Sequence, residues 1–268
     1  MSKGWKHTLL QIMLGLLLTG VLVGAYILGV QKRSEIVCTG IHVEIEDSTS
    51  TRFVTEKDII GYLDQEYKGL IGIPADSVDL YRVETILNSK NAILNSQAHI
   101  AKDGILSISI VQRKPAMLFQ GATYGFYSTA DGFLLPLQPG YEEEVLVIEG
   151  SIPIGSADCS KGRPEDPEKI EWLDKIVEIG RRISESPLWK NRIARIECAS
   201  SGELTIIPKE GRERFLFGHP EDIEEKFEKA RLYYERITAD KGHDAYDIVD
   251  LRYRNQIVCK DTESNKKR

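Results

Sequence analysis

The sequence predicts an α+β protein with one N-terminal transmembrane helix and two domains that follow it. The first domain is small, with the order strand-helix-helix-strand-strand, and the second is a mixed β-sheet with flanking helices. Three observations predict this. The run Leu9–Val30 carries no charged side chain. Apolar residues then alternate, or recur at helical spacing, between residues 36 and 113. A longer series of strand-like runs, interrupted by amphipathic stretches, fills residues 116–260.

The apolar run is long enough to cross a bilayer, since a span needs roughly 20 residues at about 1.5 Å each. We expect residues 9–30 to be a signal anchor, with residues 1–8 as a cytoplasmic tail. The bulk of the chain would then lie outside the cytoplasm, because long domains are translocated whatever the flanking charges. The alternative is a cleaved signal peptide that ends near Val23 and Ala25, but the apolar run continues beyond them.

Composition narrows the classes of partner. The chain has 268 residues and a net charge of −6, and no stretch gathers lysine and arginine into a basic stripe. This argues against nucleic acid as a partner. Four cysteines allow three disulfide pairings, and no spacing among them is typical of zinc; they are Cys38, Cys159, Cys198 and Cys259. The sequence leaves open whether any pair is bonded, although Cys198 and Cys259 lie in apolar runs where buried thiols are common.

The first domain is predicted over residues 36–115. Alternation through Ile41, Val43 and Ile45 indicates a strand buried on one face. Thr55 with Asp58 three residues later forms a capping box, which predicts a helix start. A second short helix is striped by Leu80, Val83 and Leu87. Two strands at 93–101 and 105–112 flank Asp103-Gly104, a strong hairpin signal. One three-stranded sheet with two helices on one face accounts for this pattern.

The second domain is predicted over residues 116–260, followed by a disordered tail at 261–268. Pro167 and Pro220 are expected to begin helices, since proline fits the first helical position. Residues 155–166 are expected to be loop. The last element, Ile248–Lys260, alternates through Val249 and Leu251 and is expected to be one strand. Other strands are expected at 116–120, 124–128, 133–135, 145–148, 193–198, 204–207 and 215–217.

Catalytic and metal-binding motifs are missing from the sequence. It has no HExxH, GxSxG, phosphate loop or calcium loop, so we expect neither an enzyme nor a cofactor. His42 and His99 alternate with apolar neighbours and are expected to face solvent. Glu142-Glu143-Glu144 is expected to be a solvated patch, and Ser200-Ser201-Gly202 a turn. The charged residues of the last long helix are expected on its exposed face; they are Glu224, Glu225, Lys226, Lys229 and Arg231.

A chain without a catalytic site can still bind partners through a sheet edge. An edge strand displays unpaired amides and carbonyls, to which an incoming segment can add as a further strand. We expect the C-terminal strand to be such an edge, and the alternative is an interior strand that ends the fold.

Several motifs in this order resemble the FtsQ/DivIB family of bacterial cell-division proteins, closest to its Bacteroidetes-type members. Val111-Gln112-Arg113-Lys114-Pro115 is similar to the exit of the family's POTRA domain. Asp131-Gly132 followed by Leu135-Pro136-Leu137 resembles a hairpin of its β domain. Asp250-Leu251-Arg252-Tyr253 followed by Gln256-Ile257-Val258 is similar to its terminal strand. The resemblance covers nearly the full chain and implies that residues 36–115 are a POTRA-like domain.

The resemblance implies a non-enzymatic scaffold of the divisome in the bacterial inner membrane at the division septum, with the bulk of the chain in the periplasm. Its partners would be FtsB/DivIC-like and FtsL-like single-pass proteins, bound by strand addition, together with other divisome components, and it would link them to septal peptidoglycan synthesis. The partner-binding residues, carried over by position, would be Leu251, Arg252, Tyr253, Gln256 and Val258.

Structural alternatives apply to several of these positions. Leu251 is expected to pack inward rather than to touch a partner. Asp250 either ends the preceding loop or pairs with a nearby arginine, and Tyr253 shares the parity of Leu251, so it could also belong to the core. Another POTRA-bearing transport or assembly component is the alternative function, although such proteins normally repeat the unit and the 36–113 pattern occurs once.

Overall fold

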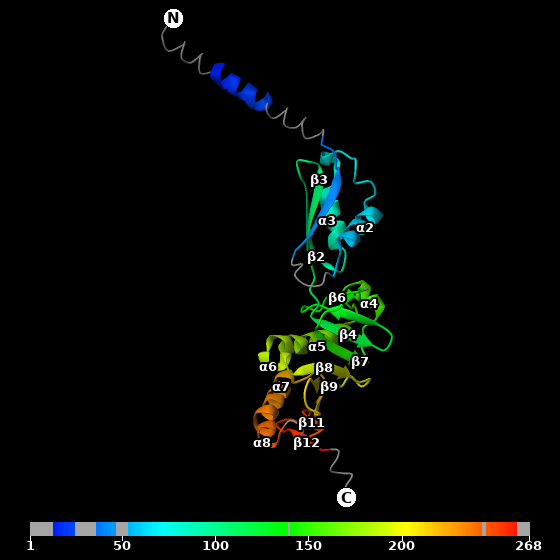
Figure 1. The fold of residues 1–268 in the computed structure, drawn as a ribbon, viewed down its shortest axis with the longest axis vertical. Helices are drawn as coiled ribbons and strands as arrows, with labels where there is room; N and C mark the ends of the chain where they lie inside the picture. The colour runs from blue at the N-terminus through cyan, green and yellow to red at the C-terminus, as the bar shows by residue number, and fades with distance from the viewer. Residues whose placement is uncertain (1–12, 25–35, 47–52, 139, 243–244, 262–268) are drawn as a thin grey trace, which may run out of the picture. The chain divides into compact units, whose positions relative to one another are not determined.

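The computed structural model describes residues 13–24, 36–46, 53–138, 140–242 and 245–261 (Figure 1). Residues 13–24 are helical, inside the predicted anchor. Residues 9–12 and 25–30 of that prediction, the predicted tail at 1–8, and residues 262–268 of the predicted tail at 261–268 lie outside the described residues. Within the described ranges, no helix combines the length and the apolar character that a membrane crossing requires. The chain divides into two compact units that separate between Gln112 and Arg113.

The first unit has the predicted strand-helix-helix-strand-strand order. Its sheet has the strand order β1-β3-β2, with β1 parallel and β2 antiparallel to the central β3. The elements are β1 (Gly40–Ile45), α2 (Glu56–Glu66), the short 3₁₀ turn η1 (Ala75–Ser77), α3 (Leu80–Asn88), β2 (Ile93–Ile100) and β3 (Ile105–Gln112). The predicted capping box begins α2: the Thr55 hydroxyl accepts from the Asp58 amide, and the Asp58 carboxylate accepts from the Thr55 amide at 2.8 Å.

Alternation along β3 decides which face of this sheet is buried. Leu106, Ile108 and Ile110 are buried, and the residues between them are half-exposed. His42 and His99 are exposed, as predicted. The α+β class is therefore confirmed in this unit by the packing of two helices against one face of the sheet.

The second unit is built on a nine-stranded mixed sheet with the order β12-β11-β10-β9-β8-β7-β4-β5-β6. The pairs β4–β7, β7–β8 and β10–β11 are parallel, and the other pairs are antiparallel. The strands are β4 (Met117–Gly121), β5 (Gly125–Ser128), β6 (Leu134–Pro136), β7 (Leu146–Gly150), β8 (Ile193–Cys198), β9 (Leu204–Pro208), β10 (Arg214–Gly218), β11 (Ile248–Asp250) and β12 (Val258–Lys260).

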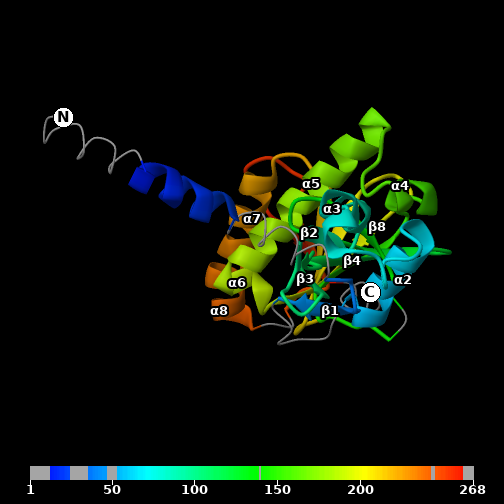
Figure 2. The ribbon, with the colours of Figure 1, turned by 90° about the horizontal axis from the view of Figure 1, so that it is seen from above.

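Helices cover one face of this sheet and form the core with it. The helical elements are α4 (Ser156–Ser160), α5 (Pro167–Glu185), α6 (Pro187–Lys190), α7 (Ile223–Leu232), the π-helical segment η2 (Tyr233–Thr238) and α8 (Ala239–Lys241). In Figure 2, α6, α7 and α8 lie together on one side of the strands. Leu173 and Ile176 of α5 pack in one cluster with Phe227 of α7 and with Ile148 and Ile196 of the sheet.

The opposite face of the sheet carries an ion-pair ladder. Arg195 of β8 binds Glu149 of β7 at 2.7 Å and Glu197 of its own strand at 3.1 Å. Glu197 also pairs with Arg214 of β10. These half-exposed pairs keep the middle of the uncovered face polar.

Three predictions of where helices and strands begin and end in the second unit are wrong. The expected loop at 155–166 contains α4, which is capped because the Asp158 carboxylate accepts from the Gly155 amide at 2.9 Å. Helix α7 begins at Ile223 and not at Pro220, because Asp222 before it adopts a left-handed conformation with φ of 49°. The expected single strand at 248–260 is two strands, β11 and β12, with residues 251–257 between them.

The four cysteines, all described, form no disulfide with one another. Cys38, Cys159 and Cys198 are buried, whereas Cys259 is half-buried on β12. Burial suits these side chains, since cysteine outside a disulfide packs as a small apolar side chain.

Candidate partner-binding edge

The nine-stranded sheet ends in two strands, β6 on one side and β12 on the other, and β12 is the open one. Strand β12 pairs with β11 through Lys260 with Ile248, Cys259 with Val249, and Val258 with Asp250. No strand in the described ranges pairs with its outer side. Half of its backbone donors and acceptors therefore face outward, as in any edge strand.

The β6 edge is covered instead. The Leu134 amide donates to the Gly162 carbonyl at 2.7 Å, and α4 lies against this strand. Pro136, at the end of β6, has no amide hydrogen to offer. Gly162 packs so closely on the ring of Phe133 that a Cβ atom would lie 2.2 Å from it, and its φ is 77°. A ladder bond to another strand is thus replaced by a loop contact.

The residues predicted to bind a partner lie on two different segments, strand β12 and the loop before it. Val258 alone lies on β12, where it is half-buried. Leu251, Arg252, Tyr253 and Gln256 lie in the connecting loop at 251–257. The chain leaves the sheet directly after the Leu251 amide donates to the Leu216 carbonyl at 3.0 Å.

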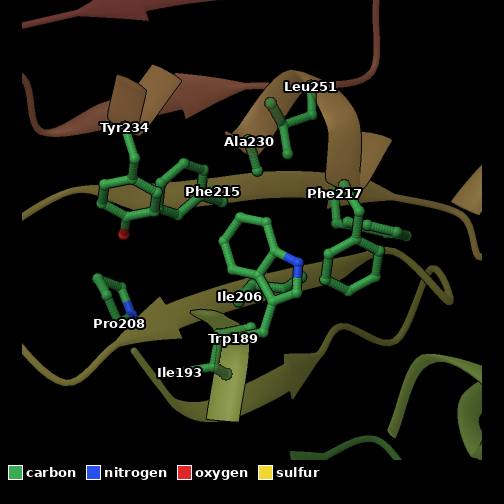
Figure 3. Close-up of a pocket in the computed structure, with 10 residues that line it drawn as sticks. Trp189, Ile193, Ile206, Pro208, Phe215, Phe217, Ala230, Tyr234 and Leu251 are labelled. Carbon is green, nitrogen blue, oxygen red and sulfur yellow. The ribbon is translucent and has the colours of Figure 1, made fainter. Parts of the chain in front are cut away.

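Leu251 is a core residue, as the structural alternative expects. Its side chain is fully buried and points into a small apolar cavity, together with Ala230 of α7, Trp189 of α6 and Phe217 of β10 (Figure 3). The cavity leaves about 10 Å³, which is about the room that one water needs. Its lining is apolar, so it is core packing and not a ligand site.

Arg252 is held by carboxylates of this chain. Its guanidinium binds both oxygens of Asp250, at 2.9 and 2.8 Å, and Glu203 at 3.1 Å. Asp250 is 1% exposed. Burial alone would raise the pKa of the Asp250 carboxyl, but the hydrogen bonds and charge of Arg252 outweigh it and hold that pKa below 3.8. Gly218 gives Arg252 room, since a Cβ atom there would lie 2.8 Å from its Cγ.

Two residues of α7 fix the loop at 251–257. The Lys229 ammonium donates to the Leu251 carbonyl at 2.6 Å and to the Tyr253 carbonyl at 2.8 Å. Glu225 accepts from the Asn255 amide at 3.0 Å and pairs with Lys229 at 3.3 Å. Burial of the carbonyls without such donors would be costly, so these contacts select one loop conformation.

The sequence placed Lys226 and Lys229 on the exposed face of α7, and this prediction is wrong. Each is only 7% exposed. The Lys226 ammonium donates to the His219 carbonyl at 2.7 Å, and burial lowers its pKa. No helical pattern could reveal either burial, because the contacting groups lie outside α7: His219 precedes the helix, and the carbonyls of Leu251 and Tyr253 follow it.

The loop still presents an exposed surface next to β12. Tyr253 is 48% exposed, which excludes its alternative placement in the core. Arg254, Asn255 and Gln256 are also exposed, and so is Lys260 at the end of β12. The surface therefore combines a phenol ring with positive charge beside an open strand.

Comparison with known families gives two matches. A family model described as "FtsQ/DivIB, C-terminal related" matches residues 114–260, which is more than half of the chain. The chain belongs to the FtsQ/DivIB family. A POTRA-like domain model matches residues 36–111. No curated protein matches the sequence.

Membership of the FtsQ/DivIB family gives the chain a coarse role, that of a cell-division scaffold. The family is one of non-enzymatic cell-division scaffolds, and no group of three His, Cys, Asp or Glu side chains in the described ranges is placed to hold a metal ion. Within this FtsQ/DivIB domain, sequence reasoning missed Lys229, Glu225 and Glu203, which position the loop. It also did not include Cys259 and Lys260 in the site. Only their position on the terminal strand could have indicated them.

Proposed function

We propose that this FtsQ/DivIB-family chain is a membrane-anchored scaffold that binds an FtsB/DivIC-like and FtsL-like coiled-coil pair. Binding would occur by strand addition at β12, and the scaffold would link the pair to septal peptidoglycan synthesis at the inner membrane. The observation that carries this proposal is the open outer side of β12 at the end of the sheet in the family-matched domain. Backbone pairing supplies affinity in such complexes, and side chains beside the strand supply specificity.

The predicted binding residues divide the work in this proposal. Val258 joins β12 to β11 through its backbone, whereas Tyr253 and Gln256 contact the partner from the loop beside it. Arg252 acts mainly by fixing the loop, since Asp250 and Glu203 already occupy its guanidinium. Leu251 anchors the loop in the core and touches no partner.

Charge beside β12 indicates the chemistry of the added strand. Arg254 and Lys260 are exposed, and their charges help to lower the pKa of the Glu225 and Asp250 carboxyls of this chain. A strand that carries Asp or Glu at the facing positions would complement them, and such complementarity chiefly raises the association rate and the specificity.

Membrane anchoring is supported by the uncharged run at residues 9–30. An anchor confines the edge to the membrane surface, where single-pass partners carry their own coiled coils. Even a short edge strand could then bind well, since tethering raises the effective concentration of one partner near the other.

Proline substitution on β12 tests strand addition directly. Successive amides of a strand point to opposite sides. Val258→Pro therefore removes an inward donor, which faces β11, and Cys259→Pro removes an outward donor. We expect the inward variant to lower the free energy of unfolding, and the outward variant to keep stability but lose capture of the co-expressed coiled-coil pair. Binding is measured by pull-down of the full chain in detergent, and stability by circular dichroism in urea.

Tyr253→Lys is the matched probe of the loop, because its exposed ring can be replaced without disturbing the core. Loss of capture in the outward proline variant and in Tyr253→Lys supports the proposal. Equal capture by the wild type and by both proline variants would contradict strand addition at β12. Capture of transport components in place of division proteins would contradict the scaffold role itself.

A further inference from the structure

Two exposed apolar side chains lie on neighbouring segments at one end of the POTRA-like unit. Val37 is 42% exposed and Ile71 is 63% exposed. Backbone bonds fix their two segments side by side: the Gly72 amide donates to the Cys38 carbonyl, and the Cys38 amide to the Ile73 carbonyl, both at 2.8 Å. This pair is therefore a rigid feature of the unit.

The turn around Ile71 is built to present that side chain. Gly69 and Gly72 have φ of 83° and 91°, and between them Leu70 turns into the core while Ile71 turns outward. Turn tips are normally occupied by Asn, Asp, Ser or Gly, because these residues satisfy the turn and its hydration. A β-branched apolar residue at such a tip gains nothing from the fold.

The same end of the unit is where the chain enters from the predicted anchor. The anchor prediction ends at Val30, and the unit begins at Ile36. Six Cα steps span at most roughly 20 Å when fully extended. The headgroup layer on each side of the hydrocarbon core is about 5–8 Å thick. The short connection thus keeps Val37 and Ile71 within reach of the membrane surface.

Charged residues around the pair do not oppose such a contact. Lys68 and Lys102 are exposed at this end, balanced by the exposed Asp76 and Asp103. The hairpin tip that carries Lys102 and Asp103 is joined to the entering chain, since the Thr39 amide donates to the Gly104 carbonyl at 2.9 Å. Lysine stems can lie along the interface with their ammonium groups in water.

We propose that Val37 and Ile71 seat this end of the POTRA-like unit in the headgroup region of the bilayer that holds the anchor. The proposal rests on the membrane anchor of the proposed function. Two apolar side chains would bind a bilayer weakly on their own, but the tether makes the contact intramolecular, so weak insertion suffices. The contact would restrict the tilt of the unit on its short connection.

Spin labelling of the full chain tests this contact. Ile71→Cys is compared with Leu94→Cys, because Leu94 is an apolar residue of similar exposure, 55%, at the start of β2. Strand β2 runs to Ile100 beside the Ala101–Gly104 tip, so about six residues, roughly 20 Å, separate the two positions along the sheet. Both variants carry Cys259→Ser, and the three remaining thiols are buried.

The labelled chains are placed in nanodiscs of phosphatidylethanolamine and phosphatidylglycerol, and label accessibility to oxygen and to a water-soluble nickel chelate is measured. We expect the label at position 71 to favour oxygen and the label at position 94 to favour the chelate. Equal chelate access at both positions would overturn the membrane contact while leaving the anchor intact. Extraction of the unlabelled full chain from membranes by alkaline carbonate would overturn the anchor, and this contact with it.

Discussion

The two edges of the nine-stranded sheet differ in how their unpaired backbone groups are treated. At β6 a loop carbonyl, a proline and the short helix α4 occupy the places that another strand could take. At β12 no described strand lies on the outer side. Lys229, Glu225 and Arg252 instead hold the adjoining loop in place. Natural sheets usually blunt their edges. Since the chain covers one edge of the sheet and leaves the other open, we infer that the open edge at β12 serves a function.

The largest expected effect comes from removing the anchor of the loop beside β12. Leu251→Ala deletes a fully buried side chain next to a cavity that is already present, so we expect a loss of about 3 kcal/mol in the free energy of unfolding. Tyr253→Ala, two residues on and half-exposed, should change stability by less than about 0.5 kcal/mol. Urea denaturation followed by circular dichroism checks both, and equal losses would contradict the inward placement of Leu251.

A slightly smaller effect is expected at the lysine that holds the same loop. Lys229→Met keeps the stem but removes the donor to two carbonyls, which should cost about 2 kcal/mol of stability and raise hydrogen exchange at residues 251–257. Arg231→Met is the control on the same helix, because the pairs of Arg231 with Glu228 and Glu235 are exposed to solvent and add little to stability. Unchanged exchange in the Lys229 variant would mean that α7 does not position the loop.

The cover of the opposite edge is tested at Gly162. Gly162→Ala adds a Cβ atom against the Phe133 ring at a positive φ, so we expect a loss of about 2 kcal/mol and faster aggregation through the uncovered β6. Gly140 has the same φ of 77° with nothing within 4 Å, so Gly140→Ala isolates the backbone strain, about 1 kcal/mol. Light scattering during mild heating compares the two variants, and identical behaviour would refute a protective role for the Gly162 contact.

The smallest effect is a pH dependence beside β12. A carboxyl whose pKa is lower in the folded chain adds stability above its unfolded pKa and loses it as pH falls through the folded pKa. Asp250 is such a group, so its contribution should be present above about pH 3.8 and fade below it. Asp250→Asn should flatten that part of the curve of unfolding free energy against pH. An unchanged acid limb in the variant would show that the Arg252 pair does not contribute.

Local signals in the sequence predicted most of the fold. The Thr55–Asp58 capping box and the Asp103-Gly104 turn act within a few residues, and both were found where expected. The terminal strand was misjudged because Leu251 and Tyr253 share a parity that looks like a continued strand. Contacts from Lys229 and Glu225, distant in the chain, pull that segment out of the sheet, and no local pattern encodes them. The loop that carries most of the candidate site therefore required tertiary structure.

The charged ladder across β7, β8 and β10 has a consequence for assembly. A broad uncovered sheet face invites face-to-face stacking, but Arg195 and its partners would have to lose water for a second sheet to settle there. Growth of the sheet is thereby limited to one dimension, sideways from β12. A partner strand added at β12 would itself become the new edge strand of the sheet. Whether the assembly stays finite is then decided by what the partner does with its own far side.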